Sequence, residues 1–182
     1  LYVRVGGRTI AELVTMPVDE LIPFFGGLRL DEHDTKTAAR ILVEIRNRLQ
    51  YLADVGLGYL TLDRLSSTLS GGESQRVKLA SFLTKETSDG SILFIFDEPT
   101  TGLHFHDISK LLAAFNALIE RGHTIVVVEH NMEIIKCADW VVDLGPEAGT
   151  GGGRVVFEGT PRALEECPES HTGEFLRLRT KL

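Results

Sequence analysis

Two adjacent carboxylates, Asp97 and Glu98, directly follow the apolar run 92–96. Such a run is typical of a strand buried on both faces of a parallel sheet, and the carboxyl ends of parallel strands form the edge at which these sheets bind ligands. An aspartate at that edge can hold Mg²⁺ directly or through water, and the adjacent glutamate can orient or deprotonate an attacking water. An acidic helix start before Pro99 is the alternative, which two acids immediately after a strand make less favoured.

A second feature is the glycine-rich segment 69–76, where a loop enters a helix. Gly71 and Gly72 allow backbone amides to approach an oxyanion, the Ser70 hydroxyl can donate to it, and the helix N-terminus adds a partial positive charge. This is phosphate-binding chemistry. The alternative is a simple helix cap, in which Ser70 and Glu73 form a capping box, and the residues alone leave both interpretations open.

His130 is the third candidate, because Glu129 and His130 follow a second apolar run, 124–128. A single histidine at a strand end is more often structural. However, polar groups at the ends of consecutive parallel strands converge on one edge of a sheet. We therefore expect His130 to meet the site around Asp97 and Glu98.

The elements that must position these residues change character along the chain. Apolar residues recur at three- and four-residue spacing over 35–54, which predicts an amphipathic helix capped by Asp34 or Thr35 and ended by Gly56. A second helix is expected over 72–84. After residue 90 the pattern predicts a strand, a helix, a parallel strand, a short helix and two more strands that complete the half-sheet: 92–96, 107–121, 124–128, 132–137, 140–144 and 154–158.

Composition excludes several classes of protein. The 182 residues carry a net charge of −7, which disfavours a stand-alone nucleic-acid binder, and 43% are hydrophobic, as in an ordinary globular protein. No apolar run approaches the length of a membrane span, so we expect a soluble, cytoplasmic protein. Cys137 and Cys167 are far apart and predict neither a disulfide framework nor a zinc site.

Taken together, these motifs occur in the order and spacing of an ABC-type ATPase. Segment 69–73 resembles the signature motif, 92–98 the Walker B strand with its catalytic glutamate, 101–104 the D-loop, and His130 the switch histidine. The resemblance implies an α/β fold, namely a P-loop NTPase (ABC-type) half-domain with a parallel sheet core plus an α-helical signature subdomain. Residues 1–88 would form the signature subdomain and 89–182 the C-terminal ATPase half.

Further segments narrow the resemblance to the second ATPase half of the UvrA family of excision-repair proteins. These segments are 55–60, 68–80, 97–105, 129–131, 138–140 and 143–147, and the similarity extends over about residues 1–165. In that family the glycine-rich stretch 149–153 is a turn before the last strand. The partners that the resemblance implies are a second UvrA copy, UvrB and damaged double-stranded DNA, with no membrane. Basic residues on the helix 35–54 are candidates for DNA contact, although a solvated helix face explains them equally well: Arg40, Arg46 and Arg48.

The same resemblance assigns roles to individual residues. Glu98 and His130 are the expected catalytic residues, and Asp97 is the expected ligand of the Mg²⁺ that accompanies ATP. The expected ATP-binding residues are Ser70, Gly71, Gly72, Glu73, Asp97, Gly102 and His104. Ser70 and Gly72 would touch the γ-phosphate of an ATP held by the partner domain.

A P-loop is missing, since none of the six lysines follows a glycine. The family places its P-loop, Q-loop and four-cysteine zinc module upstream of the signature, so we expect this chain to start after that module, with zinc only in the upstream part. The chain alone is then predicted to hydrolyse no ATP. Two alternatives remain: the ATPase of a membrane transporter, and a non-hydrolysing interaction module that completes a partner's site.

Overall fold

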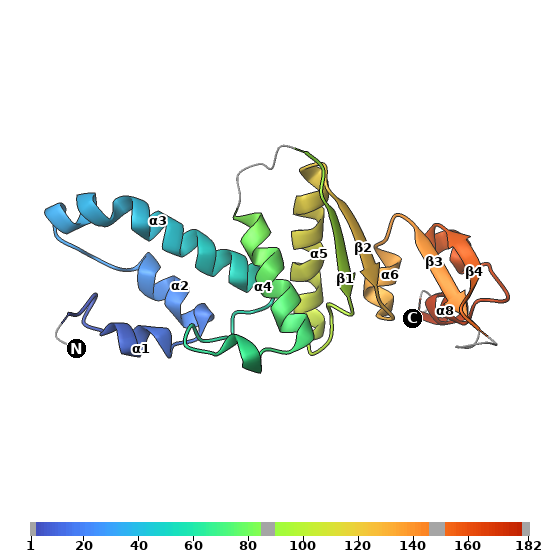
Figure 1. Cartoon of the computed structure of the whole chain (residues 1–182), viewed down its shortest axis with the longest axis horizontal. Helices are drawn as coiled ribbons and strands as arrows, with labels where there is room; N and C mark the ends of the chain where they lie inside the picture. Colours follow the sequence, from blue (N-terminus) through green and yellow to red (C-terminus); the bar gives the residue numbers. More distant parts are fainter. Residues whose placement is uncertain (1–2, 85–89, 146–151, 180–182) are drawn as a thin grey trace. The chain divides into compact units, whose positions relative to one another are not determined.

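The computed structural model describes residues 3–84, 90–145 and 152–179, and it divides the chain into two compact units, Leu1–Val128 and Glu129–Leu182 (Figure 1). The first unit contains eight described elements in the order α1 (Ile10–Val14), α2 (Val18–Gly26), α3 (Glu32–Asp54), the 3₁₀ turn η1 (Ser66–Thr68), α4 (Gly71–Leu83), β1 (Leu93–Asp97), α5 (Phe105–Glu120) and β2 (Thr124–Val128). The described elements of the second unit are α6 (Met132–Lys136), β3 (Val141–Gly145), β4 (Arg154–Gly159), α7 (Pro161–Leu164) and α8 (His171–Arg179). Our expected division at residue 88 concerns the parent domain and stays a prediction.

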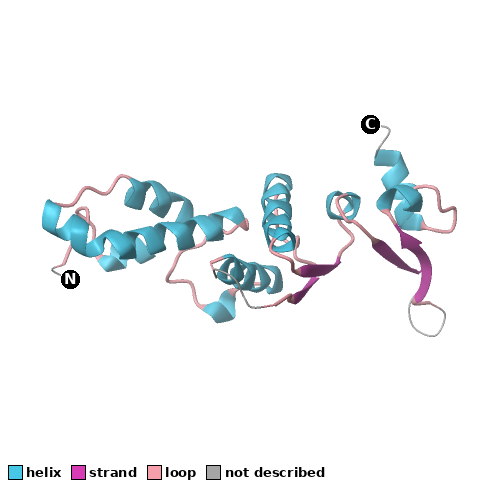
Figure 2. Ribbon diagram, turned by 90° about the horizontal axis from the view of Figure 1, so that it is seen from above, coloured by secondary structure: helices cyan, strands magenta, loops and turns pink. Residues whose placement is uncertain are grey.

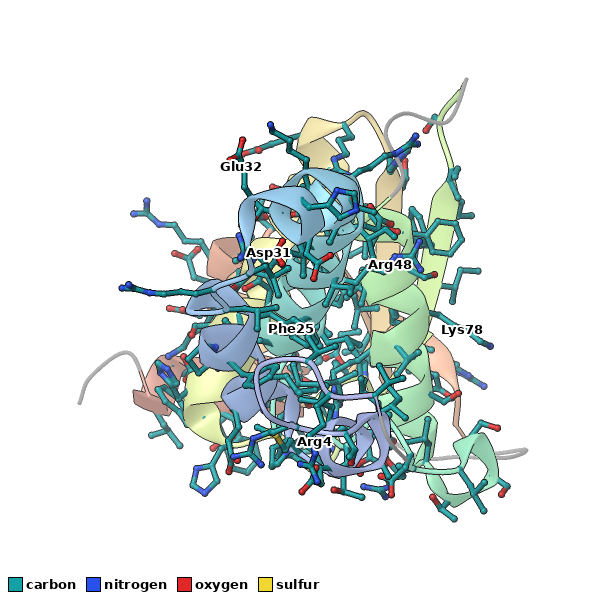
Figure 3. The ribbon with its side chains drawn as sticks, turned by 90° about the vertical axis from the view of Figure 1, so that its left-hand side faces the viewer. Arg4, Phe25, Asp31, Glu32, Arg48 and Lys78 are labelled. Atoms are coloured by element: carbon teal, nitrogen blue, oxygen red, sulfur yellow. The ribbon has the colours of Figure 1, made fainter. Side chains whose placement is uncertain are left out.

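Helix α3 is the long amphipathic helix that the sequence predicts, but it begins earlier. Its N-cap is Asp31, whose carboxylate accepts a hydrogen bond from the Asp34 amide at 2.7 Å, so neither Asp34 nor Thr35 is the cap. Its buried face packs on α1 and α2 around a small cluster of side chains: Leu13, Val18, Leu21, Leu49 and Ala53. Figure 3 shows this end of the unit, with Phe25 of α2 beside α3.

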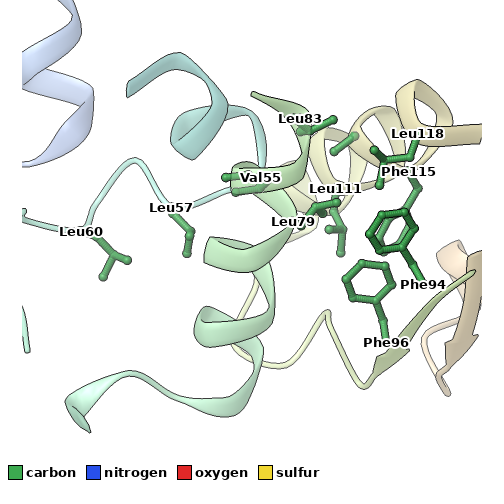
Figure 4. Packing of buried hydrophobic residues seen from close by; sticks show 12 residues of the cluster. Val55, Leu57, Leu60, Leu79, Leu83, Phe94, Phe96, Leu111, Phe115 and Leu118 are labelled. Atoms are coloured by element: carbon green, nitrogen blue, oxygen red, sulfur yellow. The ribbon is translucent and has the colours of Figure 1, made fainter. Parts of the chain in front are cut away.

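The main core lies between α4, α5 and the sheet β1–β2 (Figure 4). The strands pair in parallel from Leu93 opposite Thr124 to Asp97 opposite Val128, which confirms the predicted crossover through α5. Figure 2 shows both strands next to α5. Phe96 packs on Phe115 of α5 with ring centroids 4.9 Å apart. This packing fixes the position of the strand end relative to α5.

Strand β1 is buried on one face only, so the prediction of burial on both faces is wrong. Phe94 and Phe96 are buried, whereas Leu93 and Ile95 are 58% and 68% exposed. Neighbouring Val126 and Val128 are also exposed. The reason is that α4 and α5 pack on a single face, and none of the described elements of this unit covers the other. A continuous apolar run does not reveal this, because its residues are equally apolar on both faces.

Strands β3 and β4 do not extend the parallel sheet, contrary to our expectation. They form a separate antiparallel pair in which Val141 lies opposite Gly159. The segment between Gly145 and Arg154 is too short for a parallel crossover, which needs a dozen residues or more, so the two strands must run antiparallel. The glycine-rich turn predicted over 149–153 lies mostly outside the described residues.

Candidate active site

Residues 69–73, called the signature loop below, lead into helix α4, and a capping box forms at the N-terminus of this helix. The Glu73 amide donates to Ser70 Oγ at 3.2 Å, and the Ser70 amide donates to Glu73 Oε2 at 2.7 Å. The cap does not exclude phosphate binding, because Ser70 Oγ accepts in this pair and its hydroxyl proton stays available as a donor. The first amides of a helix have no acceptor within it, so Gly71 and Gly72 add two further donors at the same end.

Glu73 is a buried carboxylate whose oxygens have hydrogen-bond partners in the loop and in the segment that precedes it. Tyr59 Oη donates to Glu73 Oε1 at 2.6 Å, and the Arg64 guanidinium lies 3.4 Å from the carboxylate. The Tyr59 hydrogen bond, followed by that of the Ser70 amide, lowers the pKa of Glu73 below its ordinary value, while burial opposes the shift. Burial and the adjacent carboxylate raise the pKa of Tyr59. These contacts shape the loop that presents Ser70 and the glycine amides.

The loop after β1 carries the two predicted acids at an exposed position. Asp97 is the last residue of the strand, and Glu98 follows with φ +45°, a left-handed backbone conformation that residues other than glycine rarely adopt. The Glu98 amide donates to the Val128 carbonyl at 2.9 Å, and the Thr101 amide donates to the Glu98 carbonyl at 3.1 Å. The loop therefore has a defined conformation that places both carboxyl-bearing residues at the end of the sheet.

Helix α4 is bound directly to this loop through Gln75 and Arg76, two residues for which the sequence predicts no role of their own. Gln75 Nε2 donates to the Asp97 carbonyl at 2.9 Å, and its Oε1 accepts from the Asp97 amide at 3.3 Å. Arg76 Nη1 donates to the Pro99 carbonyl at 2.8 Å. The available signal was the spacing from Gly72, three and four residues back, which puts all three residues on one face of the helix.

The predicted D-loop residues lie between Glu98 and helix α5. Gly102 has φ +77°, which glycine adopts without strain, so the chain can turn sharply there. His104 is the N-cap residue of α5, makes no side-chain cap hydrogen bond, and is exposed. Both residues are on the same loop as Asp97 and Glu98, as expected from the sequence.

His130 belongs to the second unit, where it is exposed two residues before helix α6. The carboxylate of Glu129 accepts hydrogen bonds from the amides of His130 and Asn131, both at 3.1 Å, and Asn131 caps helix α6. This local geometry fixes the backbone of His130. Its expected meeting with Asp97 and Glu98 joins the two units and stays a prediction.

Asp97 has the chemistry required of a magnesium ligand. Within the described ranges, no group of three or more His, Cys, Asp or Glu side chains could form a metal cage. Mg²⁺ in nucleotide sites needs no such cage, because one or two carboxylates together with phosphate oxygens and waters complete its shell. An exposed carboxylate at the end of β1 therefore fits Mg²⁺ bound with ATP. None of the described helices is long and apolar enough to cross a membrane.

The three arginines considered for DNA contact differ in their surroundings. Arg46 donates to the Phe25 carbonyl through Nε at 2.9 Å and Nη2 at 2.6 Å, which ties α3 to α2. Arg48 pairs with Glu44 of the same helix at 2.6 Å. Arg40 is exposed on the same helix. DNA contact by these residues stays a prediction.

Helix α4, which begins with two glycines, packs on the acidic loop at the end of a parallel strand. This arrangement defines the class of the chain: it has the α/β fold of an ABC-type ATPase domain. The crystal structure of UvrA2 from Deinococcus radiodurans supports this assignment with a TM-score of 0.81 and 36% identity, and the match covers 93% of this chain and 22% of that one. No family model matches the chain.

Relatives of known name identify the particular family. UvrABC system protein A of Streptomyces avermitilis is 49% identical over 177 residues, which cover 97% of this chain and 16% of the relative. The protein of the same name from Agrobacterium fabrum is 49% identical over 97% of this chain and 17% of its own length. The chain thus corresponds to a segment of the UvrA family and spans about a sixth of the length of these relatives.

Proposed function

We propose that this chain is the part of a UvrA-like ABC ATPase that carries the signature loop and the catalytic carboxylate. In the intact protein, ATP binding and hydrolysis would serve the recognition of damaged DNA and the loading step of nucleotide excision repair in the cytoplasm. The partners in this proposal are a second UvrA copy, UvrB and damaged double-stranded DNA. A zinc module would belong to the upstream part only.

The observation that carries the proposal is the attachment of α4 to the loop after β1, in a segment about half identical to UvrABC system protein A. This attachment puts the donor groups of Ser70, Gly71 and Gly72 and the carboxyl groups of Asp97 and Glu98 in one structural unit. Phosphoryl transfer requires two sets of groups: hydrogen-bond donors that bind the phosphate, and carboxylates that hold the metal and orient the water.

The residues divide the work between two nucleotides. The Ser70 hydroxyl and the amides of Gly71 and Gly72 bind the γ-phosphate of an ATP held by the partner domain. Glu73 keeps the loop that carries these groups in shape. Asp97 holds the metal of this domain's own ATP, and Glu98 orients the attacking water and accepts its proton. Mg²⁺, when bound, neutralises the charge of the phosphate oxygens.

His130 completes the proposed catalytic pair by a hydrogen bond to the γ-phosphate of this domain's ATP. Gly102 and His104, on the D-loop, contact the nucleotide site from the side of α5. Because the chain has no glycine followed by lysine, it lacks the main phosphate-binding loop, and the isolated 182-residue chain turns over no ATP.

The test is ATP turnover by the intact protein after Glu98→Gln, with Glu120→Gln as a control on the same unit. Glu120 is the exposed last residue of α5, so its change should leave turnover unchanged. Loss of the base should lower kcat at least about a hundredfold, because general base catalysis contributes on the order of 10²–10⁴. An unchanged kcat would mean that this segment supplies no catalytic base, which is the expectation for an interaction module.

A further inference from the structure

We infer that Gln75 and Arg76 are positioning residues for Glu98, because from helix α4 they hold main-chain groups of the two residues that flank it, Asp97 and Pro99. The structural part of this inference stands on the contacts alone. Its consequence for catalysis rests on the proposed function, in which Glu98 is the base.

The backbone of Glu98 requires such support. Its φ of +45° lies in the left-handed region, where the Cβ atom of an ordinary residue crowds the neighbouring carbonyl. A residue persists in this conformation only when its surroundings fix it. The conformation also decides where the carboxylate points, since it sets the direction of the Cα–Cβ bond.

Gln75 fixes the peptide before Glu98. Its side-chain amide meets both main-chain groups of Asp97, donating to the carbonyl at 2.9 Å and accepting from the amide at 3.3 Å. Two hydrogen bonds to one residue, one donated and one accepted, define an orientation as well as a distance. A glutamine is suited to this contact because its amide has a donor and an acceptor side by side.

Arg76 fixes the carbonyl of Pro99, the residue after Glu98. Its Nη1 donates to the Pro99 carbonyl at 2.8 Å, and both residues are fully buried, with Arg76 only 1% exposed. A charged donor in a buried site makes a strong hydrogen bond. Arg76 Nε is buried without a partner among the described residues, so the side chain is retained at a cost, which indicates a role beyond filling space.

Gly72 permits this approach. A Cβ atom on Gly72 would lie 3.3 Å from the Thr101 carbonyl and 3.1 Å from Arg76 Nη1. These separations are tighter than ordinary contacts, so a side chain there would push the helix away from the loop. Gly72, the second glycine of the signature segment 69–73, is therefore also the position at which α4 comes close enough for Gln75 and Arg76 to reach their acceptors.

The inference predicts a specific kinetic signature in the intact protein. Gln75→Met keeps the length of the side chain and removes both hydrogen bonds, so kcat for ATP hydrolysis should fall about ten- to a hundredfold, as expected when a catalytic group is displaced by about an ångström. The KM for ATP should change less than about twofold, because Gln75 contacts only the loop backbone and not the nucleotide. Lys78→Ala is the matched control, since Lys78 is exposed on the same helix and points outward (Figure 3).

A second measurement separates positioning from catalysis. Hydrogen–deuterium exchange of the peptide that covers the end of β1 should become faster in Gln75→Met, because the Asp97 amide loses its acceptor. Gln75→Glu keeps an acceptor for that amide and loses the donor to the Asp97 carbonyl, so it should retain the protection of Asp97 while kcat falls. Arg76→Lys keeps the buried charge and should also lower kcat at constant KM.

The outcomes are distinguishable. If Gln75→Met folds with wild-type thermal stability and wild-type kcat and exchange, the positioning inference is wrong. If its kcat falls only in proportion to a loss of folded protein, the inference is also wrong. If the wild-type protein hydrolyses no ATP, the proposed function fails, and the exchange of the Asp97 amide alone then decides whether Gln75 holds the loop.

Discussion

Replacing Tyr59 by phenylalanine removes the hydroxyl group that contacts Glu73 of the signature segment, and we expect the first unit to become less stable at neutral pH. The hydroxyl donates to the buried Glu73 carboxylate at 2.6 Å. Hydrogen bonds to charged groups contribute about 1.5–3 kcal/mol each. Because Tyr59 is 51% exposed, and because Glu73 keeps the Ser70 amide and Arg64, the expected loss is about 1–2 kcal/mol, around the lower end of that range.

The effect should depend on pH in a defined direction. The Tyr59 hydrogen bond is the largest contribution that lowers the pKa of Glu73 from its ordinary value of 4.5. A carboxyl group whose pKa is lowered by folding stabilises the protein above its unfolded pKa, and this stabilisation is lost as the pH falls through the folded value. The difference between the wild-type chain and Tyr59→Phe should therefore be complete at pH 7 and shrink below about pH 4.5.

The assay is urea unfolding, monitored by circular dichroism, at pH 7 and at a pH below about 4.5. A loss of 1–2 kcal/mol shifts the midpoint by about 0.5–1 M urea for a denaturant slope of about 2 kcal/mol/M. Tyr51→Phe is the matched control, because the structure gives the Tyr51 hydroxyl no hydrogen bond within the described residues. An equal shift for both variants, or a Tyr59→Phe shift that stays constant into acid, would refute the reasoning.

Two further substitutions test the packing that positions the site, each against a control in the same unit. Gly56→Ala should lower the free energy of unfolding by about 1–3 kcal/mol in urea titrations, since Gly56 has φ +76° and a Cβ would lie 3.1 Å from Asp107, whereas Gly26→Ala, in open space on α2, should not destabilise. Equal effects of the two would contradict the account. Phe96→Ala should cost about 3–5 kcal/mol, because it leaves a cavity against Phe115, while Ile95→Ala on the exposed face should cost far less, and thermal unfolding can rank them.

Periodicity predicted the positions of the main elements well, because helices and strands leave local patterns. Helix α3 and strands β1 and β2 lie within a few residues of the expected ranges. The start of α3 was missed since Asp31, Asp34 and Thr35 are all acceptable caps by residue type. Only the hydrogen bond from the Asp34 amide distinguishes Asp31 from the others.

Features that depend on distant contacts were not predictable from the sequence. Burial of β1 depends on which elements cover each face, and a run such as 92–96 looks the same with one or two covered faces. The contacts of Gln75 and Arg76 join residues 22 and 23 positions apart, and no spacing rule connects a helix residue to a carbonyl at that separation. The left-handed backbone of Glu98 likewise cannot be read from its residue type, because glutamate rarely adopts a positive φ.

The most direct test of the central claim is a single-turnover measurement on the intact protein carrying Glu98→Gln, with enzyme in excess over radiolabelled ATP. If this chain supplies the catalytic base of a UvrA-like ATPase, the bound nucleotide should remain ATP over times in which the wild-type protein converts it to ADP. Conversion to ADP by the variant at the wild-type rate would contradict the account.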